Sequence, residues 1–212
     1  MKLLFTRFPL ESAHGGAEVQ TLSLMKELIA RKHSVEFLGS CPTLLKMCEE
    51  NNIPTTKLEI GPPPVTKWGV LSFCWKRTRM KKKLIKALEK FEGIDALIML
   101  SLSEKLLLTK KASQKGIKIF WIEHDRLGRW LSKNPWLSEL KLLSRRAKTI
   151  AVSDTSKQMY IDLGWPTDRT LSIPNGVTPP KVGRQRTKSD KVRVGCIARL
   201  SDDKGVDLLL AA

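Results

Sequence analysis

Three consecutive stretches of the chain decide its fold: Asp95-Ala96-Leu97-Ile98-Met99-Leu100, the mixed stretch Glu104–Lys115, and Ile117-Lys118-Ile119-Phe120-Trp121-Ile122. The two short apolar runs predict buried strands, and the longer stretch between them predicts a helix. Two strands joined by a helix are typical of a parallel sheet, because parallel neighbours need a long crossover connection.

The same alternation extends along the first 177 residues. Further strands are predicted at Lys2–Thr6, Ser34–Leu38, Thr56–Ile60, Thr149–Val152 and Leu171–Ile173. Further helices are predicted at Ala17–His33, Thr43–Asn52, Val70–Glu92, Pro135–Arg146 and Ser153–Leu163. This regular order indicates an α/β fold, a Rossmann-like, doubly wound parallel sheet covered by helices.

The composition changes after residue 177. Residues 178–191 hold two prolines, one glycine and five basic residues with almost no apolar content, which is typical of a linker. Val192–Ala198 then predicts a strand and Gly205–Ala212 opens a helix, too little to bury a core. We therefore expect a first domain at 1–177, a linker at 178–191, and the truncated start of a second Rossmann-like domain at 192–212.

Composition and charge limit the function classes. Apolar residues make up 42% of the chain and charged residues 28%, as in ordinary globular proteins. The 38 Lys and Arg against 21 Asp and Glu leave a net charge of +17, which favours phosphorylated substrates, an anionic membrane or nucleic acid as partners. No apolar run approaches the ~18 residues that span a bilayer, and Met1–Arg7 lacks the long apolar region of a signal peptide.

The four cysteines, Cys41, Cys48, Cys74 and Cys196, show no metal-ligand spacing. We expect them to be reduced and mostly buried, in a cytosolic protein. The sequence predicts neither a metal site nor a cofactor.

The first candidate site is His14-Gly15-Gly16-Ala17-Glu18, where a loop after the first strand leads into a helix. Glycines there let a ligand approach the backbone, and the N–H groups at a helix start attract phosphate. The ten residues of Arg7–Gly16 are too many for a dinucleotide fingerprint. The alternative is a glycine pair that only starts a helix, with Glu18 favourable in its first turn.

Two further candidates follow predicted strands at their carboxyl ends, where α/β sheets bind ligands. His124, in Glu123-His124-Asp125, either contacts a sugar hydroxyl or phosphate, or only satisfies its own loop. Arg199 and Lys204, in Arg199–Gly205, suit a diphosphate, and the alternative is a charged surface loop with local ion pairs. After the histidine, Trp130 and Trp136 either cover an acceptor groove or fill the core.

A basic stretch begins at Trp75, with Trp68 and Phe73 just before it. Its seven basic residues, with no acidic residue among them, are Lys76, Arg77, Arg79, Lys81, Lys82, Lys83 and Lys86. Cations beside aromatic residues suit the interface of an anionic membrane. The alternatives are a solvated helix face that packs through Leu84, and nucleic acid, for which no recognised motif is present.

Together these motifs resemble the retaining glycosyltransferases of family 4, which have the two-domain GT-B architecture. The resemblance covers the whole chain, in this order: Gly15-Gly16-Ala17-Glu18, His124, Val152-Ser153 before a helix that ends at Gly164, Ile173-Pro174-Asn175-Gly176-Val177, and Ala198–Asp207. No single motif is specific for this family, but the ordered set of motifs at these intervals is specific for it.

The resemblance implies an enzyme that transfers a sugar from a nucleotide-sugar donor to a glycan or a lipid-linked intermediate of cell-envelope polysaccharide synthesis. It implies that Arg199 and Lys204 bind the donor diphosphate and stabilise its departing charge, with His124 near the transferred sugar as a third catalytic residue. Gly15, Gly16, Glu18 and Asn175 are the other substrate-binding residues that we expect.

The resemblance also bears on activity and location. In this family the second domain holds most of the nucleotide pocket, and the family's glutamate pair falls beyond Ala212. We therefore expect this chain to be inactive by itself. We expect the intact enzyme in the cytoplasm, at the inner face of the cell membrane.

Two other classes remain open. One is a nicotinamide-dependent or methyl-transferring Rossmann enzyme, which the missing tight glycine turn disfavours. The other is a non-catalytic basic Rossmann-like module that binds an anionic membrane or another polyanion.

Overall fold

The structure, a computed structural model, describes residues 1–9, 15–124, 129–177, 195–198 and 205–211. The chain divides into two compact units, Met1–Gly176 and Val177–Ala212, and each is described by itself. In the second unit, α8 (Val206–Ala211) forms where a helix is predicted, whereas residues 195–198 of the predicted strand have no regular secondary structure.

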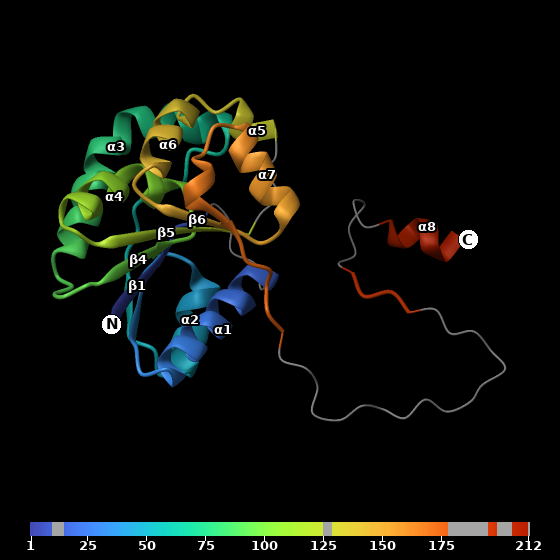
Figure 1. Cartoon of the computed structure of the whole chain (residues 1–212), viewed down its shortest axis with the longest axis horizontal. Helices are drawn as coiled ribbons and strands as arrows, with labels where there is room; N and C mark the ends of the chain where they lie inside the picture. The colour runs from blue at the N-terminus through green and yellow to red at the C-terminus, as the bar shows by residue number, and fades with distance from the viewer. Residues whose placement is uncertain (10–14, 125–128, 178–194, 199–204, 212) are drawn as a thin grey trace. The chain divides into compact units, whose positions relative to one another are not determined.

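A seven-stranded parallel sheet forms the centre of the first unit (Figure 1). Its strands are β1 (Lys2–Arg7), β2 (Ser34–Gly39), β3 (Thr55–Lys57), β4 (Ala96–Met99), β5 (Lys118–Glu123), β6 (Lys148–Ala151) and β7 (Thr170–Ser172), in the spatial order β3-β2-β1-β4-β5-β6-β7. The chain moves outward from β1 to β3, crosses to the other side of β1, and continues from β4 to β7. The predicted doubly wound α/β fold is confirmed.

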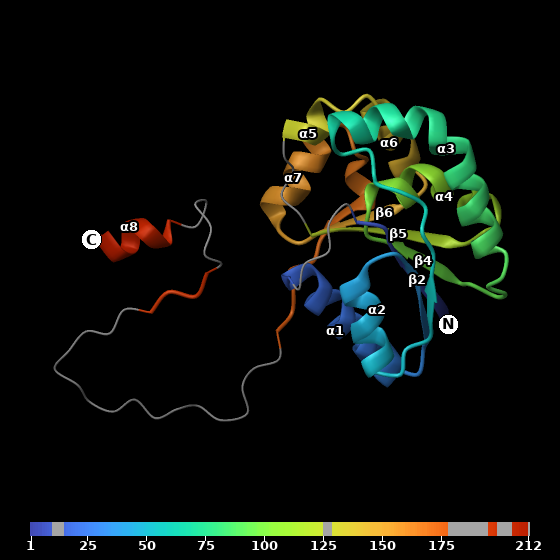
Figure 2. The same cartoon turned by 180° about the vertical axis from the view of Figure 1, so that it is seen from behind.

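Helices cover both faces of the sheet, as Figures 1 and 2 show from opposite sides. One face carries α1 (Gly16–Ala30) and α2 (Pro42–Glu50), and the other carries α3 (Lys67–Leu88), α4 (Leu102–Gln114), α5 (Arg129–Ser132), α6 (Leu137–Ser144) and α7 (Asp154–Asp162). A short 3₁₀ helix, η1 (Thr167–Arg169), precedes β7. Two apolar clusters fill the two sides, one around Phe5 and Phe37 and the other around Leu97 and Trp121.

Local contacts explain where α3 begins. The helix starts three residues before the predicted Val70, because the Oγ1 atom of Thr66 accepts a hydrogen bond from the Gly69 N–H at 3.0 Å and caps it. A Cβ atom on Gly69 would lie 2.8 Å from the Pro63 carbonyl oxygen, so glycine permits the close approach of the proline loop. Among the described residues, no helix is long and apolar enough to cross a bilayer.

The cysteines differ from the expectation that most of them are buried. Cys41 and Cys48 are buried, whereas Cys74 and Cys196 are exposed, and none of these four cysteines forms a disulfide bond. Burial, reinforced by the neighbouring Cys41, raises the pKa of the Cys48 thiol to about 12, which keeps it protonated and unreactive.

Candidate functional site

The candidate site lies at the carboxyl ends of β1, β4 and β5, where the order of the strands reverses. β1 and β4 are neighbours in the sheet, paired from Leu3 with Ala96 to Thr6 with Met99. The chain leaves β1 toward α1 on one face of the sheet and leaves β4 toward α4 on the other. Doubly wound sheets bind their ligands at such a switch point.

Among the described residues, the start of α1 has room beside it. Gly15 is its N-cap, in an extended conformation, and has no side chain with which to cap the helix. A Cβ atom built on Gly16 would meet no described atom within 4 Å. Backbone N–H groups at a helix start suit a phosphate, as the sequence predicts. His14 lies outside the described residues.

Glu18, a predicted substrate-binding residue, is engaged inside the fold. Its Oε1 atom lies 2.5 Å from Nη2 of Arg7, and the two side chains are only 5% and 14% exposed. Arg7 is the last residue of β1, so the pair joins that strand to the first turn of α1. The guanidinium also offsets a carboxylate that would otherwise repel an anion at the helix start.

The start of α4 is tied to the loop after β1. The Phe8 N–H donates to Oγ of Ser101 at 3.0 Å, and Ser101 is the N-cap of α4. The N–H groups of Leu100 and Ser101 donate to Oε1 of Glu104 at 3.2 and 2.6 Å. Burial raises the pKa of the Glu104 carboxyl from its ordinary 4.5 to about 7, and these hydrogen bonds limit the rise.

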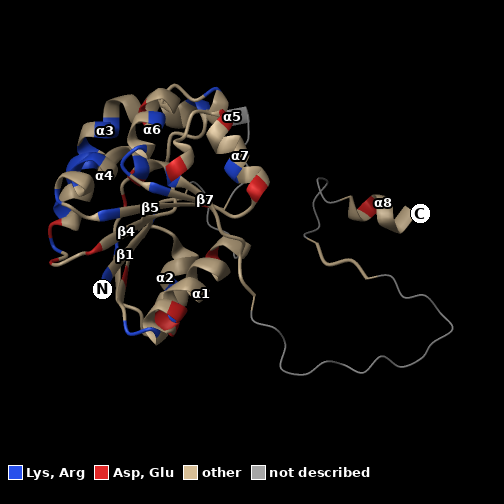
Figure 3. Cartoon of the chain, in the orientation of Figure 1, with Lys and Arg blue, Asp and Glu red and all other residues tan. Residues whose placement is uncertain are grey.

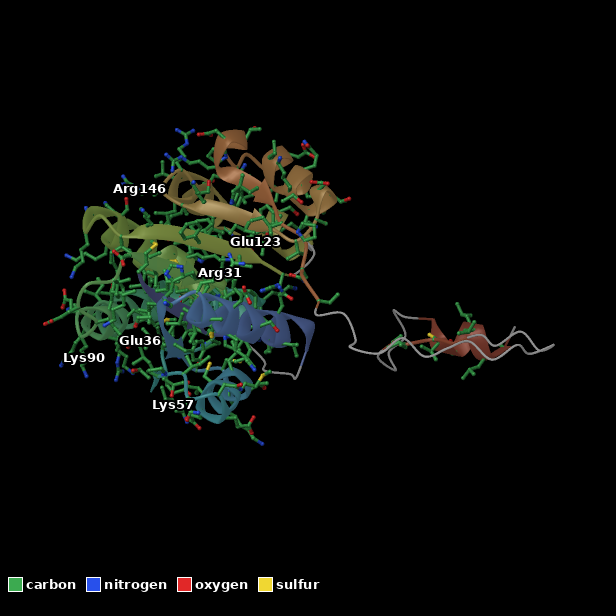
Figure 4. All side chains as sticks on the ribbon, turned by 60° about the horizontal axis from the view of Figure 1, so that its bottom comes forward. Arg31, Glu36, Lys57, Lys90, Glu123 and Arg146 are labelled. Carbon is green, nitrogen blue, oxygen red and sulfur yellow. The ribbon has the colours of Figure 1, made fainter. Side chains whose placement is uncertain are left out.

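The carboxyl end of β5 contacts both neighbouring helices. Nζ of Lys105, on α4, lies 2.8 Å from Oε1 of Glu123, and their side chains are 5% and 15% exposed. Glu123 is labelled in Figure 4, which draws the side chains of the fold as sticks. On the next residue, Nε2 of His124 lies 3.4 Å from Oγ1 of Thr21 on α1. The structure therefore brings the predicted histidine to the helix that the glycine pair begins.

These contacts link the elements at this edge in a closed cycle, called the ring below. Arg7 joins β1 to α1, Ser101 joins the loop after β1 to α4, Lys105 joins α4 to β5, and His124 joins β5 back to α1. Polar contacts that connect every element in turn hold the edge in one geometry, which is the condition for precise ligand positioning.

The remaining predicted residues lie elsewhere. Asn175 is exposed after β7, the edge strand of the sheet. Trp136 is half-buried and packs against the core: its ring centre lies 5.4 Å from that of Phe73, with the Arg77 guanidinium 4.7 Å from the Trp136 ring centre. Asp125, Arg199, Lys204 and the side chain of Trp130 lie outside what the structure describes. In the described part, no group of three or more His, Cys, Asp or Glu residues lies together as a metal site.

Four members of the ring are absent from the sequence prediction: Arg7, Thr21, Ser101 and Lys105. One signal is visible in the sequence, because Ser101 and Glu104 have the spacing of a capping box before an apolar run. Arg7 and Lys105 have no such signal, since a charged residue at a strand end or on a helix is most often solvated.

A family model described as Glycosyltransferase Family 4 matches residues 14–180, from the residue before the glycine pair to four residues past the end of the first unit. The chain belongs to glycosyltransferase family 4. The resemblance that the motifs suggest is thereby confirmed. A search of curated proteins gave no match.

Solved structures show the same fold for this family 4 chain. HepE (Alr3699) from Anabaena, in complex with UDP and glucose, is 19% identical with a TM-score of 0.62, over 84% of this chain and 45% of that one. A glycosyltransferase from Rickettsia africae ESF-5 is 20% identical with a TM-score of 0.60, over 83% and 43%. MurG from Acinetobacter baumannii is 15% identical with a TM-score of 0.54, over 84% and 46%. The chain thus spans less than half the length of each of these structures.

Proposed function

We propose that the intact protein transfers a sugar, with retention of its anomeric configuration, from a nucleotide-sugar donor to a glycan or lipid-linked acceptor of cell-envelope polysaccharide synthesis. Family membership supports the transferase activity. One observation supports the location of the site: α1 begins at a glycine N-cap at the switch-point edge, and His124 contacts the same helix through Thr21.

The proposed roles follow from this geometry. The N–H groups at the start of α1 face the donor phosphates or the acceptor, and Gly16 leaves room for them. His124 lies beside the transferred sugar and bonds to it. Arg199 and Lys204 oppose the negative charge that grows on the leaving diphosphate, and Asn175 contributes to substrate binding.

The donor class has its own support. HepE was solved in complex with UDP-glucose as well as with UDP and glucose. A UDP-sugar is therefore the first donor to test, followed by a GDP-sugar. The proposed place of work is the cytoplasm, at the inner face of the cell membrane, which the net charge of +17 supports.

A transfer assay tests the proposal. The 212-residue chain and a longer form that carries the second domain are each incubated with UDP- and GDP-sugars and with lipid-linked and glycan acceptors. We expect transfer only by the longer form, because a closed, water-excluding cleft needs both domains, and we expect NMR to show the donor's anomeric configuration in the product. Robust turnover by the 212-residue chain, or none by the longer form, contradicts the proposal.

A further inference from the structure

One face of α3 is turned away from the core of the first unit, and of its residues Lys83 donates a hydrogen bond from Nζ to the Glu59 carbonyl oxygen at 3.3 Å. The helix packs inward through Phe73, Met80, Leu84 and Leu88, which are at most 3% exposed. With 3.6 residues per turn, the opposite side of the helix carries a continuous stripe. This stripe, called the α3 face below, consists of Trp68, Leu71, Trp75, Thr78, Arg79, Lys82, Lys83 and Lys86, all of them exposed.

The α3 face has two chemically different ends. Trp68, Leu71 and Trp75 are 80%, 55% and 85% exposed, although large apolar side chains are usually covered. The basic end follows directly, and Trp75 lines a shallow depression there together with Thr78, Arg79, Lys82, Lys83 and Lys86. At 1.5 Å per residue, each end is about 10 Å long. Figure 3 shows the concentration of basic residues along this helix.

The charges of the basic end are not neutralised within the part of the chain that the structure describes. There, no acidic side chain forms an ion pair with Arg79, Lys82, Lys83 or Lys86. Arg77 behaves differently, because it pairs with Glu139 and stacks on Trp136. Of the residues that the sequence suggested for a membrane contact, Arg77 and the buried Phe73 are therefore not part of the α3 face. Lys76 and the half-buried Lys81 also lie outside its stripe.

We propose that the α3 face docks the protein on an anionic lipid membrane. The indole rings and Leu71 enter the boundary between headgroups and acyl chains, while Arg79, Lys82, Lys83 and Lys86 bind lipid phosphates. A nucleic acid offers phosphates to the basic end but leaves Trp68 and Leu71 uncovered. A lipid surface presents an apolar layer next to an anionic layer, which matches the two ends of the helix.

The proposal names the surface by which the protein would reach the membrane location proposed above. It rests on the proposed function only for that location. Each cation near an anionic surface strengthens binding about five-fold, so the loss of four is expected to weaken it at least a hundred-fold. Salt is expected to have the same effect, because the Debye length falls from ~10 Å at 0.1 M to ~3 Å at 1 M.

Vesicle co-sedimentation of the 212-residue chain tests the proposal without any sugar transfer. Phosphatidylcholine vesicles are used with and without phosphatidylglycerol, at low and high salt. The test variant carries Arg79→Gln, Lys82→Gln, Lys83→Gln and Lys86→Gln. The charge-matched control carries Lys26→Gln, Lys118→Gln, Arg146→Gln and Lys148→Gln, four exposed cations on other elements. Circular dichroism and thermal unfolding verify that both variants are folded.

We expect the wild type and the control variant to pellet with phosphatidylglycerol vesicles at low salt, and the test variant to stay in solution. A second variant, with Trp68→Ser and Trp75→Ser, is expected to bind more weakly and to lose the blue shift of tryptophan fluorescence that vesicles induce in the wild type. Equal pelleting of the test and control variants, or no pelleting of the wild type, overturns the proposal. Binding of the wild type to an RNA or DNA oligonucleotide but not to vesicles also overturns it.

Discussion

Arg7 and Glu18 form a buried ion pair that fastens the end of β1 to the first turn of α1, with 2.5 Å between Nη2 and Oε1. Glu18 is in the first turn of α1, two residues after Gly16, so the pair lies next to the glycines at which this helix begins. A charge that loses its partner in such a place is costly, because it remains away from water.

We therefore expect Glu18→Ala to lower the free energy of unfolding by about 3–5 kcal/mol. Glu27→Ala is the control, since Glu27 pairs with Arg31 at 3.0 Å on the surface, where both side chains are at least 60% exposed. Its loss is expected to be about 0.3–0.5 kcal/mol. Urea denaturation measures both values, and equal losses would mean that the Arg7–Glu18 pair contributes no more than a surface pair.

The basic pair Arg199 and Lys204 is tested by kinetics of the intact enzyme. Arg199→Ala and Lys204→Ala are each expected to cost about 2.7–4 kcal/mol of transition-state stabilisation, or roughly 100- to 1,000-fold in rate. Lys204→Arg is not expected to restore the full rate, because a planar guanidinium and a compact ammonium fit a phosphate differently. The exposed Lys118→Ala is the control, and wild-type rates in both alanine variants would reduce the motif to a charged surface loop.

The fold is predictable from the sequence because its strands are buried on both faces. Every residue of β4 is buried, so the strand appears in the sequence as an uninterrupted apolar run. The ends of elements are less predictable. Thr66 moves the start of α3 forward by a capping hydrogen bond, and β3 stops at Lys57 because that residue pairs with Gly39, the last residue of its partner β2.

The candidate site is predictable in place but not in detail. Gly15, Gly16 and His124 follow from the rule that ligands bind at the carboxyl ends of strands. The pairing of Lys105 with Glu123 does not follow, because the two residues are on different elements and 18 positions apart. A lysine in an amphipathic helix is expected to be solvated, and only the packing of α4 against the sheet places this one inside.

The buried carboxyl of Glu104 predicts a pH dependence of stability. Burial raises its pKa from 4.5 to about 7, so between these values the folded state holds a proton that the unfolded state has released. The free energy of unfolding contributed by this group therefore falls as the pH rises from about 4.5 to 7, by about 3 kcal/mol in all.

Glu104→Gln is expected to remove this fall, because an amide oxygen can accept the same backbone hydrogen bonds without ionising. Urea denaturation at several pH values measures the effect, with the exposed Glu92→Gln as the control. A variant as stable as the wild type near pH 5 and more stable near pH 8 fits the argument. The same slope in Glu104→Gln and the wild type contradicts it.

Substitutions of the two glycines at the start of α1 distinguish a role in folding from a role in binding. A Cβ atom on Gly16 meets no described atom within 4 Å, whereas one on Gly15 lies 3.2 Å from Oε2 of Glu18. Gly15→Ala is therefore expected to push the Glu18 carboxylate and reduce stability. Gly16→Ala is expected to leave stability unchanged or to raise it by up to about 1 kcal/mol, because alanine restricts the unfolded chain.

If phosphates or an acceptor approach the backbone at Gly16, its new methyl group occupies their space, and the intact enzyme with Gly16→Ala loses sugar transfer although its fold is intact. Thermal unfolding and initial rates, measured on the same preparations, distinguish the two effects. Full activity in Gly16→Ala would mean that the glycine pair only starts the helix, and that the N–H groups at the start of α1 do not face the substrate.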